Sequence, residues 1–176
     1  MVWFRRSAEH GFAPAQENLG VHLSRPGANE TSRSEAIAWF KKAYRGGGSC
    51  AATNLAITYR ESGDLRRAVY WFRNSIAAGD DGDRVDLGIH YYWGKGVRTD
   101  HAAAVRLFRK ATPRKNMSEA DRDDAFFYLG VAYFEGKGVK RSLRIANRLL
   151  QRANIDNDHP AAFRLLSQIK KISTGR

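Results

Sequence analysis

The sequence contains little cysteine and no long apolar run, and each scarcity excludes a class of protein. The single cysteine, Cys50, cannot form a disulfide within the chain or supply a cysteine metal cluster, and we interpret it as a small packed residue. No stretch reaches the roughly 18 apolar residues that a membrane span requires, and the start, MVWFRRSAEH, lacks the apolar segment of a signal peptide. We therefore expect a cytoplasmic protein without a membrane span, or an exported one if residues that precede Met1 are missing.

Acidic residues are outnumbered by basic ones. The 176 residues include 30 Lys and Arg against 18 Asp and Glu, which gives a net charge of +12. This balance favours an anionic partner such as nucleic acid, anionic lipid or an acidic protein. The hydrophobic fraction of 43% is enough to bury a core, so the chain is not a disordered segment.

Residues that could carry chemistry are present but do not form a complete motif. The five histidines are scattered, and no two of them are four residues apart. GKG occurs twice, at 94–96 and 136–138, without the Walker spacing, and Ser167 and Lys170 form an S-x-x-K without the accompanying SDN and KTG motifs. The carboxylates of EADRDD (119–124) are interpreted as charges that open a helix. The sequence therefore predicts no enzyme, no cofactor and no metal site.

Internal repetition is the main pattern in the chain. The first series of similar strings comprises LGVHL (19–23), LAITY (55–59), LGIHY (87–91), LGVAY (129–133) and LLSQI (165–169). The second series comprises WFRRSA (3–8), WFKKAY (39–44), WFRNSI (71–76), LFRKAT (107–112) and LLQRAN (149–154). In both series, small and large apolar residues recur three or four positions apart, which places them on one helical face. Two alternating series predict a two-helix unit that is repeated about four to five times at 32–42 residues.

The expected helix boundaries carry suitable capping residues. The predicted N-caps of the second-series helices are Ser32, Asp64, Asp100 and Ser142, and Ser32 with Glu35 has the spacing of a capping box. The predicted C-terminal caps are Gly11, Gly47, Gly79, Lys115 and Asn157. These boundaries predict helix hairpins over about residues 1–25, 33–62, 64–94, 99–134 and 141–171, within one repeat domain that spans 1–176.

The stretch LGIHYYWGKGVRTDHAAAVRLFRKA, within residues 83–111, resembles Sel-one-like repeats, which are relatives of tetratricopeptide repeats. LGVAYFEGKGV (129–139) continues the pattern less closely, and residues 51–79 have the shorter loop of a tetratricopeptide repeat. The resemblance covers nearly the whole chain. It implies an all-α solenoid of stacked antiparallel helix pairs, and bacterial members of such families often serve in regulation, envelope processes or toxin–immunity pairs.

Positive charge is concentrated in the second-series helices, which sum to about +10, whereas the first-series helices sum to about −1. In proteins that this sequence resembles, first-series helices line the concave side and second-series helices form the outer side. The resemblance therefore implies a basic outer face, made of Arg5, Arg6, Lys41, Lys42, Arg66, Arg67, Arg73, Arg109, Lys110, Arg148 and Arg152. It also implies an apolar concave face for binding a partner, made of Val85, Ile89, Tyr92, Phe127, Val131 and Phe134, although the same six residues fit core positions equally well.

Two functions remain open. The first is a non-catalytic scaffold or adaptor that holds a protein or peptide segment on the concave face. The alternative is binding of nucleic acid or another anionic surface by the basic outer face. We favour the first, because Trp39 and Phe40 of the string WFKK (39–42) belong to the repeat pattern and should be packed rather than free to stack on bases.

Overall fold

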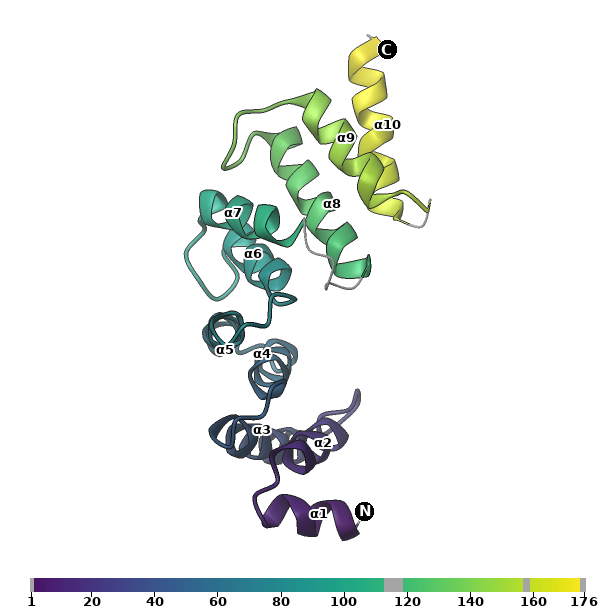
Figure 1. The fold of residues 1–176 in the computed structure, drawn as a ribbon. Helices are drawn as coiled ribbons and strands as arrows, with labels where there is room; N and C mark the ends of the chain where they lie inside the picture. The colour runs from purple at the N-terminus through teal and green to yellow at the C-terminus, as the bar shows by residue number, and fades with distance from the viewer. Residues whose placement is uncertain (1, 113–118, 157–158, 175–176) are drawn as a thin grey trace. The chain divides into compact units, whose positions relative to one another are not determined.

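The computed structural model describes residues 2–112, 119–156 and 159–174, and the secondary structure of these residues is entirely helical (Figure 1). In chain order the helices are α1 (Val2–Glu9), α2 (Ala13–Leu23), α3 (Glu30–Arg45), α4 (Ala51–Glu61), α5 (Leu65–Ala77), α6 (Arg84–Trp93), α7 (His101–Ala111), α8 (Glu119–Glu135), α9 (Leu143–Ala153) and α10 (Pro160–Thr174). The even-numbered helices hold the first-series strings and the odd-numbered helices hold the second. The predicted all-α fold of stacked helix pairs is confirmed.

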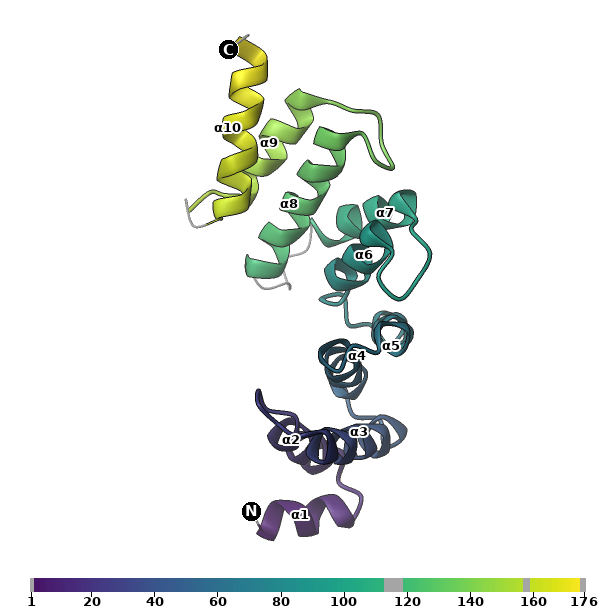
Figure 2. The ribbon, with the colours of Figure 1, turned by 180° about the vertical axis from the view of Figure 1, so that it is seen from behind.

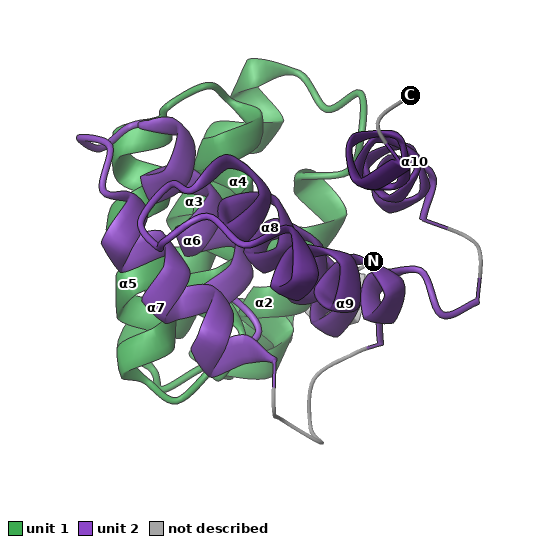
Figure 3. Ribbon diagram, turned by 90° about the horizontal axis from the view of Figure 1, so that it is seen from above, with its two compact units in different colours: residues 1–80 green, residues 81–176 purple. Residues whose placement is uncertain are grey.

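The chain divides into two compact units, residues 1–80 and residues 81–176 (Figure 3). The first unit contains α1 to α5 and the second contains α6 to α10. Within each unit, helices that follow one another along the chain pack together, and both ribbon views show α8, α9 and α10 side by side (Figures 1 and 2). The division falls between α5 and α6, inside the stretch 64–94 that the sequence assigned to one hairpin.

Each first-series helix packs most closely against the second-series helix that follows it: α2 on α3, α4 on α5, α6 on α7 and α8 on α9. The hairpins predicted from sequence joined each second-series helix to the next first-series helix instead. Those contacts exist between α1 and α2, α3 and α4, α7 and α8, and α9 and α10, but they are less extensive.

Glycine in the first-series helices explains this close pairing. A Cβ atom on Gly20 would collide with the ring of Phe40, and one on Gly88 would collide with the ring of Phe108. The absence of a side chain therefore lets a phenylalanine of the next helix lie directly against the backbone.

In α3, α5, α7 and α9, the most deeply buried large side chain comes one residue after the large residue that the sequence predicted to be buried. Phe40 is 1% exposed, and Phe72, Phe108 and Leu150 are fully buried. Trp39 is buried as predicted, at 7%, but Trp71, Leu107 and Leu149 are only half-buried. In each of these helices an alanine, at 36, 68, 104 or 146, lies four positions before the deeper residue. The deeper residue therefore shares the face of that alanine more closely than the residue three positions after it.

Three of the four predicted N-caps are confirmed. The side chains of Asp64, Asp100 and Ser142 accept backbone N–H groups at 3.0, 2.8 and 3.4 Å. The prediction for Ser32 is wrong, because α3 begins earlier, with Asn29 as its cap, and the Asn29 side chain accepts the Ser32 N–H at 2.8 Å. Glu35 does not complete a capping box, since its carboxylate accepts from Arg5 and from the Trp39 indole.

The predicted glycine C-caps are also confirmed. Gly11, Gly47 and Gly79 have φ angles of +89°, +79° and +102°, which is the left-handed region that ends helices. The other two predicted positions, Lys115 and Asn157, lie outside the described residues.

Candidate functional site

The six apolar residues expected on the concave face lie on α6 and α8, in the second unit. Val85, Tyr92 and Val131 are buried, and they belong to one core cluster with Phe108. Ile89, Phe127 and Phe134 are half-buried and pack against the core clusters. Val85, Tyr92 and Val131 are therefore core residues, whereas Ile89, Phe127 and Phe134 expose more of their surface to solvent.

The hydroxyl group of the buried Tyr92 belongs to a polar cluster between α6 and the end of α8. Its hydroxyl donates to Glu135 Oε2 at 2.6 Å, and Lys137 Nζ lies 3.0 Å from the same carboxylate oxygen. Burial and the Glu135 carboxylate raise the pKa of Tyr92. Burial alone would raise the pKa of Glu135, but the Tyr92 hydroxyl and the Lys137 ammonium lower it below its ordinary value. The cluster thus joins two helices through groups that satisfy one another.

The acidic segment 119–124 opens α8, as predicted, and Asp124 pairs with His159. His159 Nε2 lies 3.6 Å from Asp124 Oδ1, and His159 Nδ1 accepts the Ala162 N–H at 3.2 Å. Burial raises the pKa of Asp124, and His159 opposes that rise. The imidazole therefore caps the start of α10, and none of the described serines or cysteines is hydrogen-bonded to it as a nucleophile would be.

All eleven residues of the expected basic outer face are exposed. Several of their cationic groups nevertheless have partners within their own unit. Arg5 pairs with Glu35 at 2.6 Å, Arg67 pairs with Asp64 at 3.1 Å, and Arg109 donates to the Tyr133 hydroxyl at 2.6 Å. Lys42 Nζ lies 4.0 Å from the centre of the Trp39 ring, and Arg152 lies over Phe126. Five of the eleven basic residues thus pair with a carboxylate, donate to a tyrosine hydroxyl or cover an aromatic ring.

The remaining candidate nucleophiles lie at the surface. Cys50 is exposed at the start of α4, where its backbone N–H donates to Glu17 at 2.9 Å, so its interpretation as a packed residue is wrong. Ser167 is exposed and its hydroxyl donates to the Phe163 carbonyl at 3.0 Å. Within the described part of the chain, no group of three His, Cys, Asp or Glu residues could hold a metal ion.

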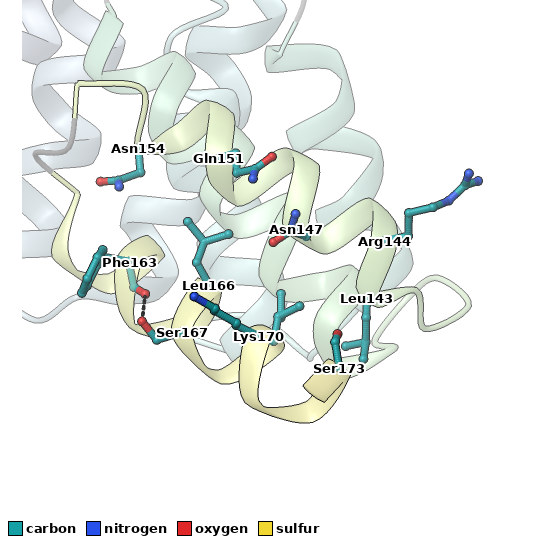
Figure 4. Close-up of a pocket in the computed structure, with 11 residues that line it drawn as sticks. Leu143, Arg144, Asn147, Gln151, Asn154, Phe163, Leu166, Ser167, Lys170 and Ser173 are labelled. Atoms are coloured by element: carbon teal, nitrogen blue, oxygen red, sulfur yellow. Dashed lines mark hydrogen bonds between the residues drawn. The ribbon is translucent and has the colours of Figure 1, made fainter. Parts of the chain in front are cut away.

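A groove between α9 and α10 is the candidate site that sequence reasoning missed (Figure 4). Its volume is about 750 Å³, and we call it the α9–α10 groove. Its lining residues are Leu143, Arg144, Asn147, Gln151, Asn154, Phe163, Leu166, Ser167, Ile169, Lys170 and Ser173. The signal was available in α9, where Leu143, Asn147 and Gln151 recur four positions apart and so share one face with a mixture of apolar and amide groups.

The two helices that form the groove carry charge of one sign. Their cations are Arg144, Arg148 and Arg152 on α9 and Arg164, Lys170 and Lys171 on α10. Neither helix contains an aspartate or a glutamate. In addition, α10 exposes large apolar side chains, with Phe163 at 62% and Ile172 at 51%. The α9–α10 pair therefore presents apolar surface within a positive field.

A family model described as Sel1 repeat matches residues 13–48, 51–80, 85–112 and 124–158. Each matched segment covers all or most of a first-series helix, followed by the second-series helix on which it packs most closely. The chain belongs to the Sel1 repeat family. Sel1 repeat proteins are generally scaffolds for protein–protein interaction and are typically not catalytic. Helix α10 follows the last matched repeat, so the α9–α10 groove lies at the end of the matched array.

Two solved structures are similar over nearly the whole chain. The first is c5321, a protective antigen of uropathogenic Escherichia coli strains with an SLR fold, which is 29% identical with a TM-score of 0.77. The second is a Sel1 repeat protein from Oxalobacter formigenes, which is 26% identical with a TM-score of 0.75. Each comparison covers 96% of this chain, together with 36% of c5321 and 68% of the Oxalobacter protein. The chain therefore spans about a third of the length of the first.

No helix in the described ranges combines the length and the apolar composition needed to cross a membrane.

Proposed function

We propose that this Sel1 repeat protein is a non-catalytic adaptor that holds a segment of a partner protein against its helix faces. The observation that carries the proposal is the α9–α10 groove, because it combines apolar side chains with amide and hydroxyl groups in a volume of about 750 Å³. That mixture suits a peptide segment, which presents both apolar side chains and backbone hydrogen-bonding groups. Half-buried Ile89, Phe127 and Phe134 are further candidate contacts in the same unit.

The alternative, binding of nucleic acid by the basic outer face, has less support. Phe40, Phe72 and Phe108 are buried in the core, and they are therefore not available to stack on bases. Several of the outer cations already pair with carboxylates or cover aromatic rings. The positive charge then serves to attract an acidic protein surface.

An affinity purification at two salt concentrations tests the adaptor proposal. The immobilised protein is incubated with extract from its source cells, with and without nuclease, and retained molecules are identified by mass spectrometry. We expect a protein that is retained after nuclease treatment and at the higher salt concentration, because apolar contacts are little affected by screening. Recovery of nucleic acid alone, with binding that falls steeply and log-linearly with salt, would instead establish the alternative.

Two exposed aromatic residues provide matched variants for this experiment. Phe163 lies in the α9–α10 groove and is 62% exposed, whereas Tyr70 lies on α5 and is 58% exposed. We expect Phe163→Ala to reduce retention of the partner and Tyr70→Ala to leave it unchanged, with both variants folded. Loss of the partner through Tyr70→Ala alone would place the binding surface on the first unit.

A further inference from the structure

We propose that the α9–α10 groove selects an acidic segment of the partner, with an apolar side chain seated between the helices and a carboxylate bound by Lys170. This inference rests on the proposed adaptor function and adds the chemical class of the segment. It is carried by three properties of the groove: its aliphatic floor, the Asn147 and Gln151 amides, which make no hydrogen bond to other described residues, and the absence of acidic residues from both helices.

The floor of the groove is aliphatic. Ile169 is buried at 5%, and Leu143 and Leu166 are half-buried, so an incoming apolar side chain would complete a surface that is already largely dehydrated. Phe163 stands at one end and exposes most of its ring. The site volume is in the range of about 300–1,000 Å³ that small-ligand sites occupy, and it is sufficient for one or two side chains of a peptide.

Asn147 and Gln151 supply hydrogen-bonding groups on the α9 side. They are four residues apart and so lie on one face, and neither side chain is hydrogen-bonded to any other residue that the structure describes. A carboxamide both donates and accepts, so each can pair with a peptide N–H and C=O of an extended segment. Asn154 is already engaged, because its Oδ1 accepts the His159 N–H at 2.9 Å.

Charge selects the acidic class of segment. The six cations of α9 and α10 are not offset by any carboxylate on either helix. Lys170 lies four residues after Leu166 on the same face of α10, beside the apolar floor, whereas Figure 4 shows Arg144 extending away from the groove. Lys170 is therefore placed to bind a carboxylate next to the seated apolar side chain.

Three short fluorescent peptides test the selection directly on the full chain by fluorescence anisotropy. In the first, leucine alternates with glutamate; in the second, leucine alternates with lysine; in the third, serine alternates with glutamate. We expect binding of the leucine–glutamate peptide to be at least about tenfold tighter than that of either other peptide. Tight binding of the leucine–lysine peptide would overturn the assignment of charge, and equal binding of the two glutamate peptides would overturn the role of the apolar floor.

Adjacent lysines give a matched pair of variants. Lys170 and Lys171 are both exposed on α10, but only Lys170 lines the groove. Replacing either lysine by glutamate changes the net charge by the same amount. Lys170→Glu should weaken binding of the leucine–glutamate peptide by about tenfold more than Lys171→Glu. Equal effects would mean that the whole basic surface attracts the peptide and that the groove does not select it.

The amides provide a test that preserves charge and fold. Asn147→Ala with Gln151→Ala introduces better helix formers and removes no hydrogen bond among the described residues, so circular dichroism and thermal unfolding should be unaffected or improved. Peptide affinity should nevertheless fall by about tenfold. Unchanged affinity would overturn the contribution of the amides to the site.

An oligonucleotide separates this inference from the nucleic-acid alternative. We expect a single-stranded oligonucleotide to compete weakly with the leucine–glutamate peptide. Lys170→Glu and Lys171→Glu should weaken binding of the oligonucleotide equally. Stronger binding of the oligonucleotide than of any peptide would overturn the inference. If none of the three peptides binds but the affinity purification still recovers a protein, the adaptor function is supported and the acidic-segment inference is wrong.

Discussion

At the level of single residues, the fold depends on contacts between a residue with no side chain and a large one on the next helix. Gly88 of α6 faces Phe108 of α7, and Phe108 is fully buried. Helix propensity by itself would favour alanine at residue 88, whereas contact with the Phe108 ring requires glycine. A substitution at this position therefore shows which of the two effects is larger.

Gly88→Ala should therefore destabilise the protein although alanine is the better helix former. The added Cβ would collide with the Phe108 ring, and overpacking of this kind costs about 1–3 kcal/mol, against a gain of about 1 kcal/mol from helix propensity. We expect a lower free energy of unfolding in urea denaturation. The effect should shrink when the same change is made in a Phe108→Leu background, whereas stabilisation by Gly88→Ala would contradict the close packing of the two helices.

The Tyr92–Glu135–Lys137 cluster makes stability depend on pH. The folded protein lowers the pKa of Glu135, so ionised Glu135 stabilises the fold above its unfolded-state pKa, and this stabilisation is lost as the pH falls through the lowered value. Glu135→Gln should therefore lower the melting temperature at about pH 7 and have much less effect at about pH 3. Glu61→Gln, at an exposed glutamate on α4, serves as the control. An equal loss at both pH values would show that the carboxylate charge is not involved.

At the level of the helix, the capping residues decide where each element begins. The side chain of Asn29 accepts the Ser32 N–H, and α3 begins at Glu30. Both Asn29 and Ser32 are good capping residues, and the structure uses the earlier one.

Replacing each of these two residues by alanine distinguishes the two possible starts of α3. Asn29→Ala should lower the free energy of unfolding by about 1 kcal/mol, because it removes the side chain that accepts the Ser32 N–H. Ser32→Ala should change it by no more than about 0.5 kcal/mol, as is usual for a helix-surface substitution. Chemical denaturation of both variants checks this, and the reverse order of effects would place the cap at Ser32.

At the level of the whole molecule, the chain is made of two compact units whose cores are built from neighbouring helices. In an array of this type each repeat contacts only its neighbours, so stability is a sum of local terms and need not be lost all at once. Trp39 belongs to a core cluster with Ala8, Ala15 and Leu19, all within residues 1–80.

Trp39→Ala should therefore destabilise the first unit selectively. Loss of a buried aromatic side chain costs about 3–5 kcal/mol. Hydrogen exchange should become faster across the helices of residues 1–80 and remain unchanged across those of residues 81–176. A uniform increase over both ranges would show that the two units unfold as one.

The sequence predicted much of this fold because the repeat signal is local. Ala36, Asp64 and Gly79 each act through residues within one or two helical turns, so helix type, caps and repeat period could be inferred without knowledge of tertiary contacts. The residues expected on the concave face were harder to place, since apolar residues such as Val85 and Tyr92 recur at the same spacing whether they face a partner or the core. The structure buries both side chains in the core.

By itself, the sequence determined that the chain is an array of paired helices of the Sel1 type, because hydrophobic periodicity and capping residues specify local structure and recur in each unit. Only the tertiary structure decided which of two adjacent large residues is the more deeply buried, which helix is the closest neighbour of each helix, and where apolar and amide groups remain exposed. The α9–α10 groove forms because α9 packs against α10, two separate stretches of the chain. This packing places Leu143, Asn147 and Gln151 of α9 along the same groove as Leu166 and Lys170 of α10.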